Sequence, residues 1–283
     1  MKVGVVGAGT MGRGIGQIFA QSGHDVIIID VSPEALNFAR KDIKNSLERL
    51  LKKDKIKEAP ETILGRIEFL GDIESLKSCA IVIEAVFERI DIKKDTLAKI
   101  SSFVSEDAVI GSNTSSISID VLSRSVKRPE RFLGIHCFNP VPVMSLVEIV
   151  PSEATSREIL ETTTELLKSV GKDPVFSKNF PGFISNRILM PMIREAILTY
   201  EQGIASPSDI DKTFMLGMNH PMGPLKLADF IGLDVCYDIM EVLYRDFGNP
   251  SFKPPITLKN LVDSGKLGVK SGRGFYNYKV KKE

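Results

Sequence analysis

Residues 3–19 read VGVVGAGTMGRGIGQIF, and this stretch decides the first element of the fold. Val3–Val6 is typical of a short buried strand, and apolar residues recur at helical spacing after the glycines. A second apolar run, Val26–Ile29, follows and ends at Asp30. The order strand, glycine turn, helix, strand and acid predicts one βαβ unit.

The three glycines of the GAGTMG turn suit the binding of a dinucleotide. Gly7 lets the chain turn sharply, Gly9 lets the backbone approach a pyrophosphate, and Gly12 lets helix and strand pack closely. Thr10 and Met11 begin the helix, whose N-terminal N–H groups attract phosphate. A glycine-rich bend without a ligand is the alternative interpretation. The flanking strand, helix and acid favour the nucleotide.

Asp30 favours one type of dinucleotide. Its carboxylate can accept hydrogen bonds from an adenosine ribose and would repel a 2′-phosphate. Val31 and Ser32 follow, and neither offers a cation to such a phosphate. The expected cofactor is therefore NAD. The sequence contains no GxxxxGK[ST] motif, so nothing in it supports ATP hydrolysis by a P-loop.

Apolar runs continue to alternate with helical patterns through the first two-thirds of the chain. Continuous apolar runs suit a buried, largely parallel sheet. Further strands are expected at Ile67–Leu70, at Ala80–Ile83 before Glu84, at Ala108–Gly111 and at Phe132–His136.

The pattern changes near Asn179–Gly182. A helical stretch covers Ile184–Tyr200, Ser206 has the features of a helix N-cap, and the next strand-like run is Phe275–Tyr278. We therefore predict an α/β protein with a Rossmann-type, mostly parallel sheet over residues 1–180 and an all-helical domain over residues 181–283.

His136 and Glu148 form a candidate acid–base pair. His136 ends an apolar strand, where ligands collect in open α/β sheets. Period-two alternation places Glu148 on an apolar face, so its carboxylate should be buried and need a partner. A histidine would serve, and the carboxylate would stabilise its imidazolium form. The alternatives are a core histidine and an edge strand that turns Glu148 to water.

Two further polar segments are candidates to join this pair. Residues 112–116 read SNTSS after a strand, and Asn186 begins the helical domain. Simple capping of turns and helices is the more common role for serine and asparagine, and spacing leaves both roles open.

The composition of the chain limits the classes of partner, compartment and metal site that we expect. The 283 residues carry a net charge of +1, which favours neither nucleic acid nor a membrane surface. Three scattered cysteines fit a reducing compartment and predict a cytoplasmic protein. The three histidines lack metal-ligand spacing, so no metal site is expected.

Positive charge is concentrated locally. Residues 40–57 contain eight basic and three acidic side chains. This charge forms either a solvated helix face or an anchor for a polyanionic group such as the phosphorylated ADP portion of coenzyme A.

Six motifs taken together resemble the L-3-hydroxyacyl-CoA dehydrogenase family, and they occur in family order over essentially the whole chain. They are GAGTMG at 7–12, SNTSS at 112–116, GIHCFNPVPVM at 134–144, PGFISNR at 181–187, HPMGP at 220–224 and KSGRGFY at 270–276.

The resemblance implies a role for each matching residue. His136 would be the catalytic base, Glu148 would orient it, Ser115 would hydrogen-bond the 3-oxygen of the substrate, and Asn186 would complete the site. It places Glu88 and Lys93 near the nicotinamide ribose, Asn113 beside the nicotinamide, and Ser46 and Lys53 against coenzyme A. Members of the family are usually homodimers through the helical domain. Cys137 departs from the aromatic residue common after the histidine, which puts acyl-length preference in doubt.

The expected activity is NAD-dependent, reversible oxidation of an (S)-3-hydroxyacyl-CoA, with 3-hydroxybutyryl-CoA the favoured substrate. Two alternatives stay open: a dehydrogenase of a free 3-hydroxy acid on the same scaffold, and a non-catalytic NAD-binding or structural relative.

Overall fold

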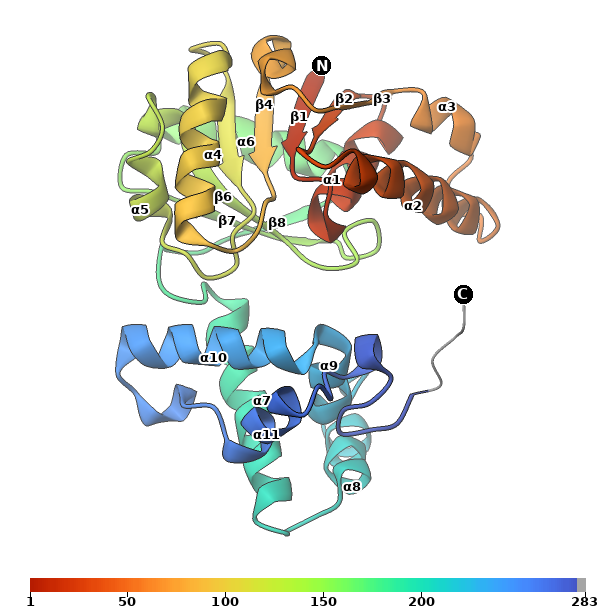
Figure 1. Ribbon diagram of the computed structural model, residues 1–283, viewed down its shortest axis with the longest axis vertical. Helices are drawn as coiled ribbons and strands as arrows, with labels where there is room; N and C mark the ends of the chain where they lie inside the picture. The colour runs from red at the N-terminus through yellow and green to blue at the C-terminus, as the bar shows by residue number, and fades with distance from the viewer. Residues whose placement is uncertain (279–283) are drawn as a thin grey trace. The chain divides into compact units, whose positions relative to one another are not determined.

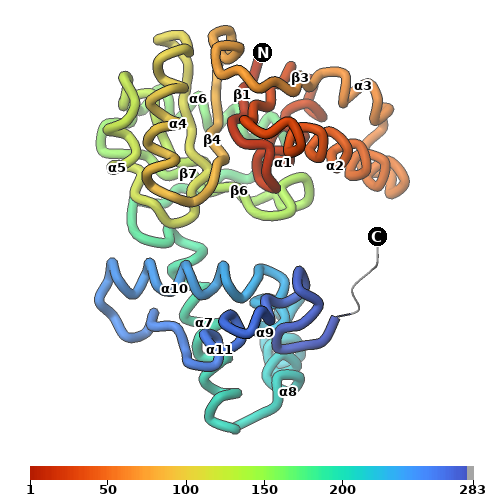
Figure 2. The backbone as a smooth tube through the Cα atoms, in the orientation of Figure 1, coloured from red at the N-terminus to blue at the C-terminus, as the bar shows by residue number. Residues whose placement is uncertain are grey.

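The computed structural model describes residues 1–278, which divide into two compact units (Figures 1 and 2). The first unit is Met1–Phe180, and the second begins at Pro181. Each unit has its own hydrophobic core.

The first unit is built on one eight-stranded sheet, with strand order β3-β2-β1-β4-β5-β6-β7-β8. Every neighbouring pair is parallel except β6 and β7, which are antiparallel. The chain leaves β1 toward β2 and returns on its other side at β4. This change of direction creates the crevice at which α/β sheets bind ligands. The strands are β1 (Lys2–Val6), β2 (Asp25–Ile29), β3 (Ile67–Leu70), β4 (Ile81–Glu84), β5 (Val109–Ser112), β6 (Phe132–Cys137), β7 (Leu146–Pro151) and β8 (Asp173–Phe176).

Helices cover both faces of this sheet. The main core cluster joins one face to apolar residues of α1, α2, α3 and α6. On the opposite face, α5 packs so closely that a Cβ on Gly134 would lie 2.7 Å from Ile119 Cδ1. The helical elements are α1 (Thr10–Gln21), α2 (Pro33–Leu51), α3 (Pro60–Leu64), η1 (Ile73–Ser78), α4 (Ile90–Phe103), α5 (Ile119–Ser123), η2 (Pro129–Arg131) and α6 (Arg157–Ser169).

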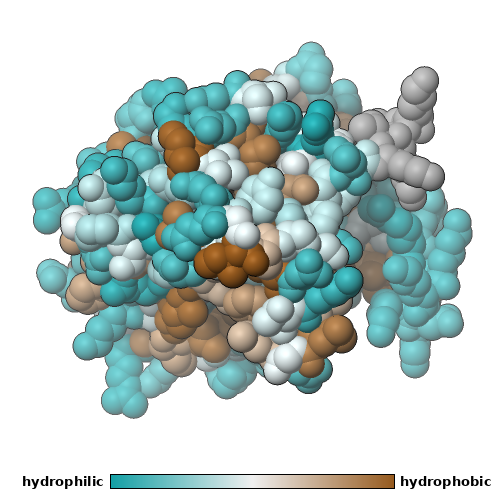
Figure 3. Space-filling view, turned by 90° about the horizontal axis from the view of Figure 1, so that it is seen from below, coloured by the Kyte–Doolittle hydropathy of each residue, from teal (hydrophilic) through white to brown (hydrophobic). Residues whose placement is uncertain are grey.

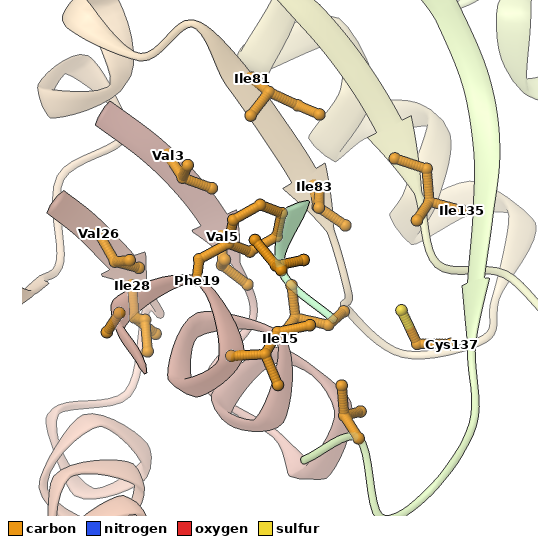
Figure 4. Close-up of a cluster of buried hydrophobic side chains, with 14 of the residues drawn as sticks. Val3, Val5, Ile15, Phe19, Val26, Ile28, Ile81, Ile83, Ile135 and Cys137 are labelled. Atoms are coloured by element: carbon orange, nitrogen blue, oxygen red, sulfur yellow. The ribbon is translucent and has the colours of Figure 1, made fainter. Parts of the chain in front are cut away.

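The core of the first unit forms where α1 lies on the sheet. Ile15 and Phe19 of α1 pack toward Val5 and its neighbours, and Cys137 lies at the margin of the same cluster (Figure 4). These side chains are almost completely buried. Cys137 therefore fills the sheet core, and the structure gives it a packing role. Burial raises the pKa of its thiol to about 12.

The second unit is helical in the described residues. Apolar side chains of α7, α9, α10 and α11 make its core. Its elements are α7 (Ser185–Glu201), α8 (Pro207–Lys212), η3 (Thr213–Gly217), α9 (Pro224–Ile231), α10 (Leu233–Phe247), η4 (Pro250–Phe252), α11 (Ile256–Asp263) and η5 (Val269–Ser271). No helix among residues 1–278 is long and apolar enough to span a bilayer.

The strand-like run at Phe275–Tyr278 does not form a strand, so that prediction is wrong. Only isolated bridges occur here among the described residues: Arg273 pairs with Gly268, and Asn277 of this run pairs with Arg273. The buried carboxylate of Asp229 accepts hydrogen bonds from the backbone amides of Phe275 and Tyr276, both at 3.0 Å. The segment therefore wraps around this carboxylate instead of pairing with another strand.

Candidate active site

The glycine turn has the geometry that a dinucleotide requires. Gly7 has a φ of +107°, and a Cβ on Gly12 would lie 1.8 Å from the Gly7 carbonyl oxygen. These two glycines are needed by the turn itself. A Cβ on Gly9, in contrast, would have no atom within 4 Å. Gly9 leaves open space at the N-terminus of α1, where no side chain caps the helix and no acidic residue occupies its first turn. Thr10 and Met11 form that first turn. The turn therefore fits a pyrophosphate.

Asp30 lies at the carboxyl end of β2 and braces this turn. Its Oδ2 accepts a hydrogen bond from the Ala8 amide at 2.8 Å, and its Oδ1 accepts one from the Ser32 amide at 3.0 Å. Ser32 also caps α2, because its hydroxyl oxygen accepts a hydrogen bond from the Ala35 amide. Asp30 thus presents a fixed negative charge beside the glycines, which fits a ribose diol better than a 2′-phosphate.

His136 and Glu148 face each other across the one antiparallel strand pair of the sheet. The register pairs them directly, and His136 Nδ1 lies 2.6 Å from Glu148 Oε2. Glu148 is 1 % exposed, so the carboxylate is buried as the alternation predicts, and the edge-strand alternative is excluded. Nδ1 carries the hydrogen that this carboxylate accepts. Nε2 is consequently the basic nitrogen of the ring.

A second buried ion pair lies at the ends of β4 and β5. Lys93 Nζ is 2.7 Å from Glu84 Oε1, and both side chains are 0 % exposed. Glu84 Oε2 also accepts the Ser112 hydroxyl at 2.6 Å. Two such charges remain buried because each satisfies the other. Sequence reasoning missed Glu84 as part of the site, although the rule applied to Glu148 also fits a carboxylate that ends an apolar strand.

Glu88 joins this ion pair to the serine-rich loop at 114–116. Its Oε2 lies 3.3 Å from Lys93 Nζ. Its Oε1 accepts hydrogen bonds from the Thr114 hydroxyl and from the amides of Ser115 and Ser116. Burial opposes ionisation of this carboxyl, but the Lys93 ammonium and these hydrogen bonds outweigh it and lower the pKa of Glu88. Glu88 is therefore a carboxylate at neutral pH.

Asn113 fixes the start of the same loop against β6. Its Oδ1 accepts the Cys137 amide at 3.0 Å, immediately after His136. The first unit therefore brings together the glycine turn, Asp30, the 84–88 segment, the 113–116 loop and the His136–Glu148 pair at the carboxyl edge of its sheet.

Three further residues, Ser46, Lys53 and Asn186, were predicted from the sequence to bind substrate or complete the site. Ser46 is partly buried on α2, and Lys53 is exposed just beyond the end of that helix. Asn186 is 7 % exposed in the first turn of α7, in the second unit.

Lys172 is a buried cation that sequence reasoning did not single out. It is 6 % exposed, and its Nζ donates to the carbonyl oxygens of Val141 and Met144 at 2.5 and 2.6 Å. Burial lowers the pKa of this ammonium. Lys172 thus holds the segment that connects His136 to Glu148. A lysine after a glycine in a polar stretch gives no sequence signal for such a role.

Comparison with known proteins identifies this arrangement. The family model for the NAD binding domain of 3-hydroxyacyl-CoA dehydrogenase matches residues 2–180, and the model for the C-terminal domain of that family matches residues 182–278. The chain belongs to the 3-hydroxyacyl-CoA dehydrogenase family. It is therefore an NAD-dependent oxidoreductase, and the predictions of NAD and of a Rossmann-type unit followed by a helical unit are confirmed.

Several relatives of this dehydrogenase match along nearly their whole length. A probable 3-hydroxybutyryl-CoA dehydrogenase of Deinococcus radiodurans is 48 % identical, covering 98 % of this chain and 100 % of that protein. A 3-hydroxybutyryl-CoA dehydrogenase of Clostridioides difficile is 43 % identical over 98 % of this chain and 99 % of its own. The crystal structure of (S)-3-hydroxybutyryl-CoA dehydrogenase from Ralstonia eutropha superposes with a TM-score of 0.93 at 46 % identity, covering 98 % of this chain and 99 % of that one.

Proposed function

We propose that this dehydrogenase oxidises (S)-3-hydroxybutyryl-CoA reversibly to acetoacetyl-CoA. The observation that carries the proposal is the buried His136–Glu148 pair, which lies at the same edge of the sheet as the glycine turn. The names of the relatives from Deinococcus, Clostridioides and Ralstonia support the short acyl chain.

His136 performs the proton transfer. In oxidation, Nε2 takes the proton of the 3-hydroxyl group, and in reduction the imidazolium returns a proton to the 3-oxygen. Glu148 holds Nδ1–H and balances the positive charge that the ring gains. Acid–base help of this kind contributes about 10²–10⁴-fold to the rate. NAD, when bound, supplies the hydride acceptor or donor for C3.

Other residues bind the substrate and the cofactor and orient them for the reaction. Ser115 donates its hydroxyl hydrogen to the 3-oxygen, and Asn186 adds an amide to the site. The glycine turn, from Gly7 to Gly12, holds the pyrophosphate, and Asp30 holds the adenosine ribose. Glu88 and Lys93 lie near the nicotinamide ribose, and Asn113 lies beside the nicotinamide.

Coenzyme A binds through the basic segment at residues 40–57. Ser46 and Lys53 contact its phosphorylated end. Lys53 and Lys55 are exposed, so the charge is available to a polyanion. Binding at the basic segment distinguishes a CoA ester from a free 3-hydroxy acid as substrate, because the free acid has no phosphorylated group to occupy this segment.

The test is NADH oxidation with a series of 3-ketoacyl-CoA esters that begins at acetoacetyl-CoA. We expect turnover of acetoacetyl-CoA, much slower turnover of free acetoacetate, and weak use of NADPH. Equal kcat/KM values for the ester and the free acid would favour the free-acid alternative. His136→Gln should still bind NADH and lose about 10²–10⁴-fold in kcat. Near-normal turnover would refute the role of His136.

We further propose a homodimer formed through the helical unit, residues 181–283, in the cytoplasm. Large apolar side chains are exposed in that unit, and Figure 3 shows apolar groups gathered near the middle of one face. The exposed large apolar side chains of residues 181–278 include Ile188, Ile204, Leu216 and Met218. All three cysteines are unpaired, as a reducing compartment requires. Light scattering coupled to size exclusion tests the dimer, and cell fractionation tests the compartment.

A further inference from the structure

One oxygen of the Glu88 carboxylate accepts hydrogen bonds from several residues of the loop that carries Ser115. Glu88 Oε1 accepts the amide of Ser115 at 2.9 Å, the amide of Ser116 at 3.0 Å and the hydroxyl of Thr114 at 2.6 Å. The Ser116 hydroxyl is 3.1 Å away, and the Ser115 hydroxyl is the most distant donor at 3.3 Å. The loop is therefore held by two of its backbone amides together with the hydroxyls of Thr114 and Ser116. The Ser115 hydroxyl makes the contact that is most easily exchanged for a substrate oxygen.

The other end of Glu88 is anchored in the interior. Its Oε2 faces Lys93, whose fully buried ammonium is also paired with Glu84. Glu84 in turn accepts the hydroxyl of Ser112, at the end of the neighbouring strand. A fully buried ammonium is unfavourable unless anionic partners surround it, so Lys93 and its two carboxylate partners hold one another in place. Glu88 is thus held against the carboxyl ends of β4 and β5.

The segment that leads to Glu88 also supports the glycine turn. A Cβ on Gly7 would lie 2.5 Å from the Ala85 carbonyl oxygen, so turn and segment are in close contact. The Val86 amide donates to Glu84 Oε1 at 2.8 Å. A continuous series of contacts therefore runs from the dinucleotide turn, through residues 84–88, to the loop of Ser115.

We propose that Glu88 is a positioning residue that aims the Ser115 hydroxyl at the substrate oxygen, and that Lys93 and Glu84 hold it in place. This inference rests on the proposed role of Ser115. It adds to the cofactor contact that the family resemblance implies for Glu88, because it assigns the carboxylate a second task on the substrate side. Removing the carboxylate deprives two backbone amides of their acceptor and releases the loop.

A double-mutant cycle tests whether Glu88 acts through Ser115. The cycle compares kcat for acetoacetyl-CoA, at saturating NADH, in the unmodified enzyme, Glu88→Ala, Ser115→Ala and the double variant. Residues that act through one another are non-additive. We expect Glu88→Ala to lower kcat about tenfold when Ser115 is present and less than about twofold in the Ser115→Ala background. The same factor in both backgrounds would overturn the proposal.

Amide hydrogen exchange gives a readout that does not depend on turnover. In the NADH-bound enzyme, the amides of Ser115 and Ser116 should exchange faster in Glu88→Ala than in the unmodified protein. Unchanged protection would show that the carboxylate does not hold the loop and would overturn the proposal. Glu88→Gln keeps an oxygen for these amides and should recover part of both protection and kcat; recovery of neither would also count against it.

Glu74→Ala is the matched control, because this glutamate is exposed on η1. It should leave kcat and exchange unchanged. Failure of the proposed function is distinguishable, since the unmodified enzyme would then not reduce acetoacetyl-CoA at all. Failure of the present inference would leave that enzyme active and the cycle additive.

Discussion

Glu148→Gln is the sharpest test of the acid–base pair. Glutamine has nearly the same shape as glutamate, so it fits the buried position, and its amide oxygen can still accept the hydrogen on Nδ1 of His136. What it removes is the negative charge 2.6 Å from the ring. A hydrogen bond to a charged group contributes about 1.5–3 kcal/mol. That charge matters most when the ring is protonated, so we expect kcat to fall about 10- to 100-fold.

The assay is NADH absorbance with acetoacetyl-CoA, with NADH affinity and Tm recorded for each variant. NADH should bind as in the unmodified enzyme, because Glu148 lies away from the glycine turn in the sheet order. Glu158→Gln, an exposed glutamate on α6, is the control and should leave kcat unchanged. A kcat for Glu148→Gln within about twofold of the unmodified value, with Tm preserved, would refute the view that this carboxylate supports the reaction.

Further perturbations test the rest of the site. Gly9→Ala should keep Tm within about 2 °C, because its Cβ enters open space, yet weaken NADH binding about tenfold or more; unchanged affinity in titrations would contradict the pyrophosphate assignment. Gly12→Ala should cost at least about 2 kcal/mol in urea unfolding, because its Cβ collides with the backbone of Gly7. Lys172→Met should lower the free energy of unfolding by about 2 kcal/mol and Tm by about 4–8 °C, because two carbonyl oxygens lose their hydrogen-bond donor. A Tm equal to that of the unmodified protein would rule out a stabilising role for Lys172. Because the folded-state pKa of Glu88 is lowered, its contribution to stability is complete above the unfolded value of 4.5 and is lost as pH falls through the folded value. The Tm difference between the unmodified protein and Glu88→Ala should therefore be largest near neutral pH and shrink in acid, and a difference that grows in acid would contradict the sign.

The main strands were predictable because each is an uninterrupted apolar run bounded by turn residues. The β1 strand and the five others expected from such runs begin and end within a residue of their predicted limits. The β8 strand (Asp173–Phe176) was missed, since it begins with Asp173-Pro174, and proline is depleted in strands. Phe275–Tyr278 was misjudged because its aromatic residues imitate a strand while its amides bind a distant carboxylate.

Within the site, the sequence was informative where burial forced a pairing. Glu148 had to find a partner, and the register of β6 and β7 supplies His136. The contact between Glu88 and the 114–116 loop was beyond sequence reasoning, because it joins an exposed connection after β4 to the one after β5. No periodic pattern spans two such connections, and none indicates that Lys93 is fully buried against Glu84 and Glu88.

Because His136 and Glu148 are directly paired on adjacent strands, insertions and deletions are restricted within those strands. Inserting or deleting one residue inside β7 would rotate the carboxylate to the opposite side of the sheet and abolish the chemistry without requiring the protein to unfold. Additions at Val143, which is 68 % exposed at the tip of the connection, leave the pairing register intact. An insertion there would still separate the two carbonyl oxygens that Lys172 holds, so we expect an active dehydrogenase with a lowered Tm.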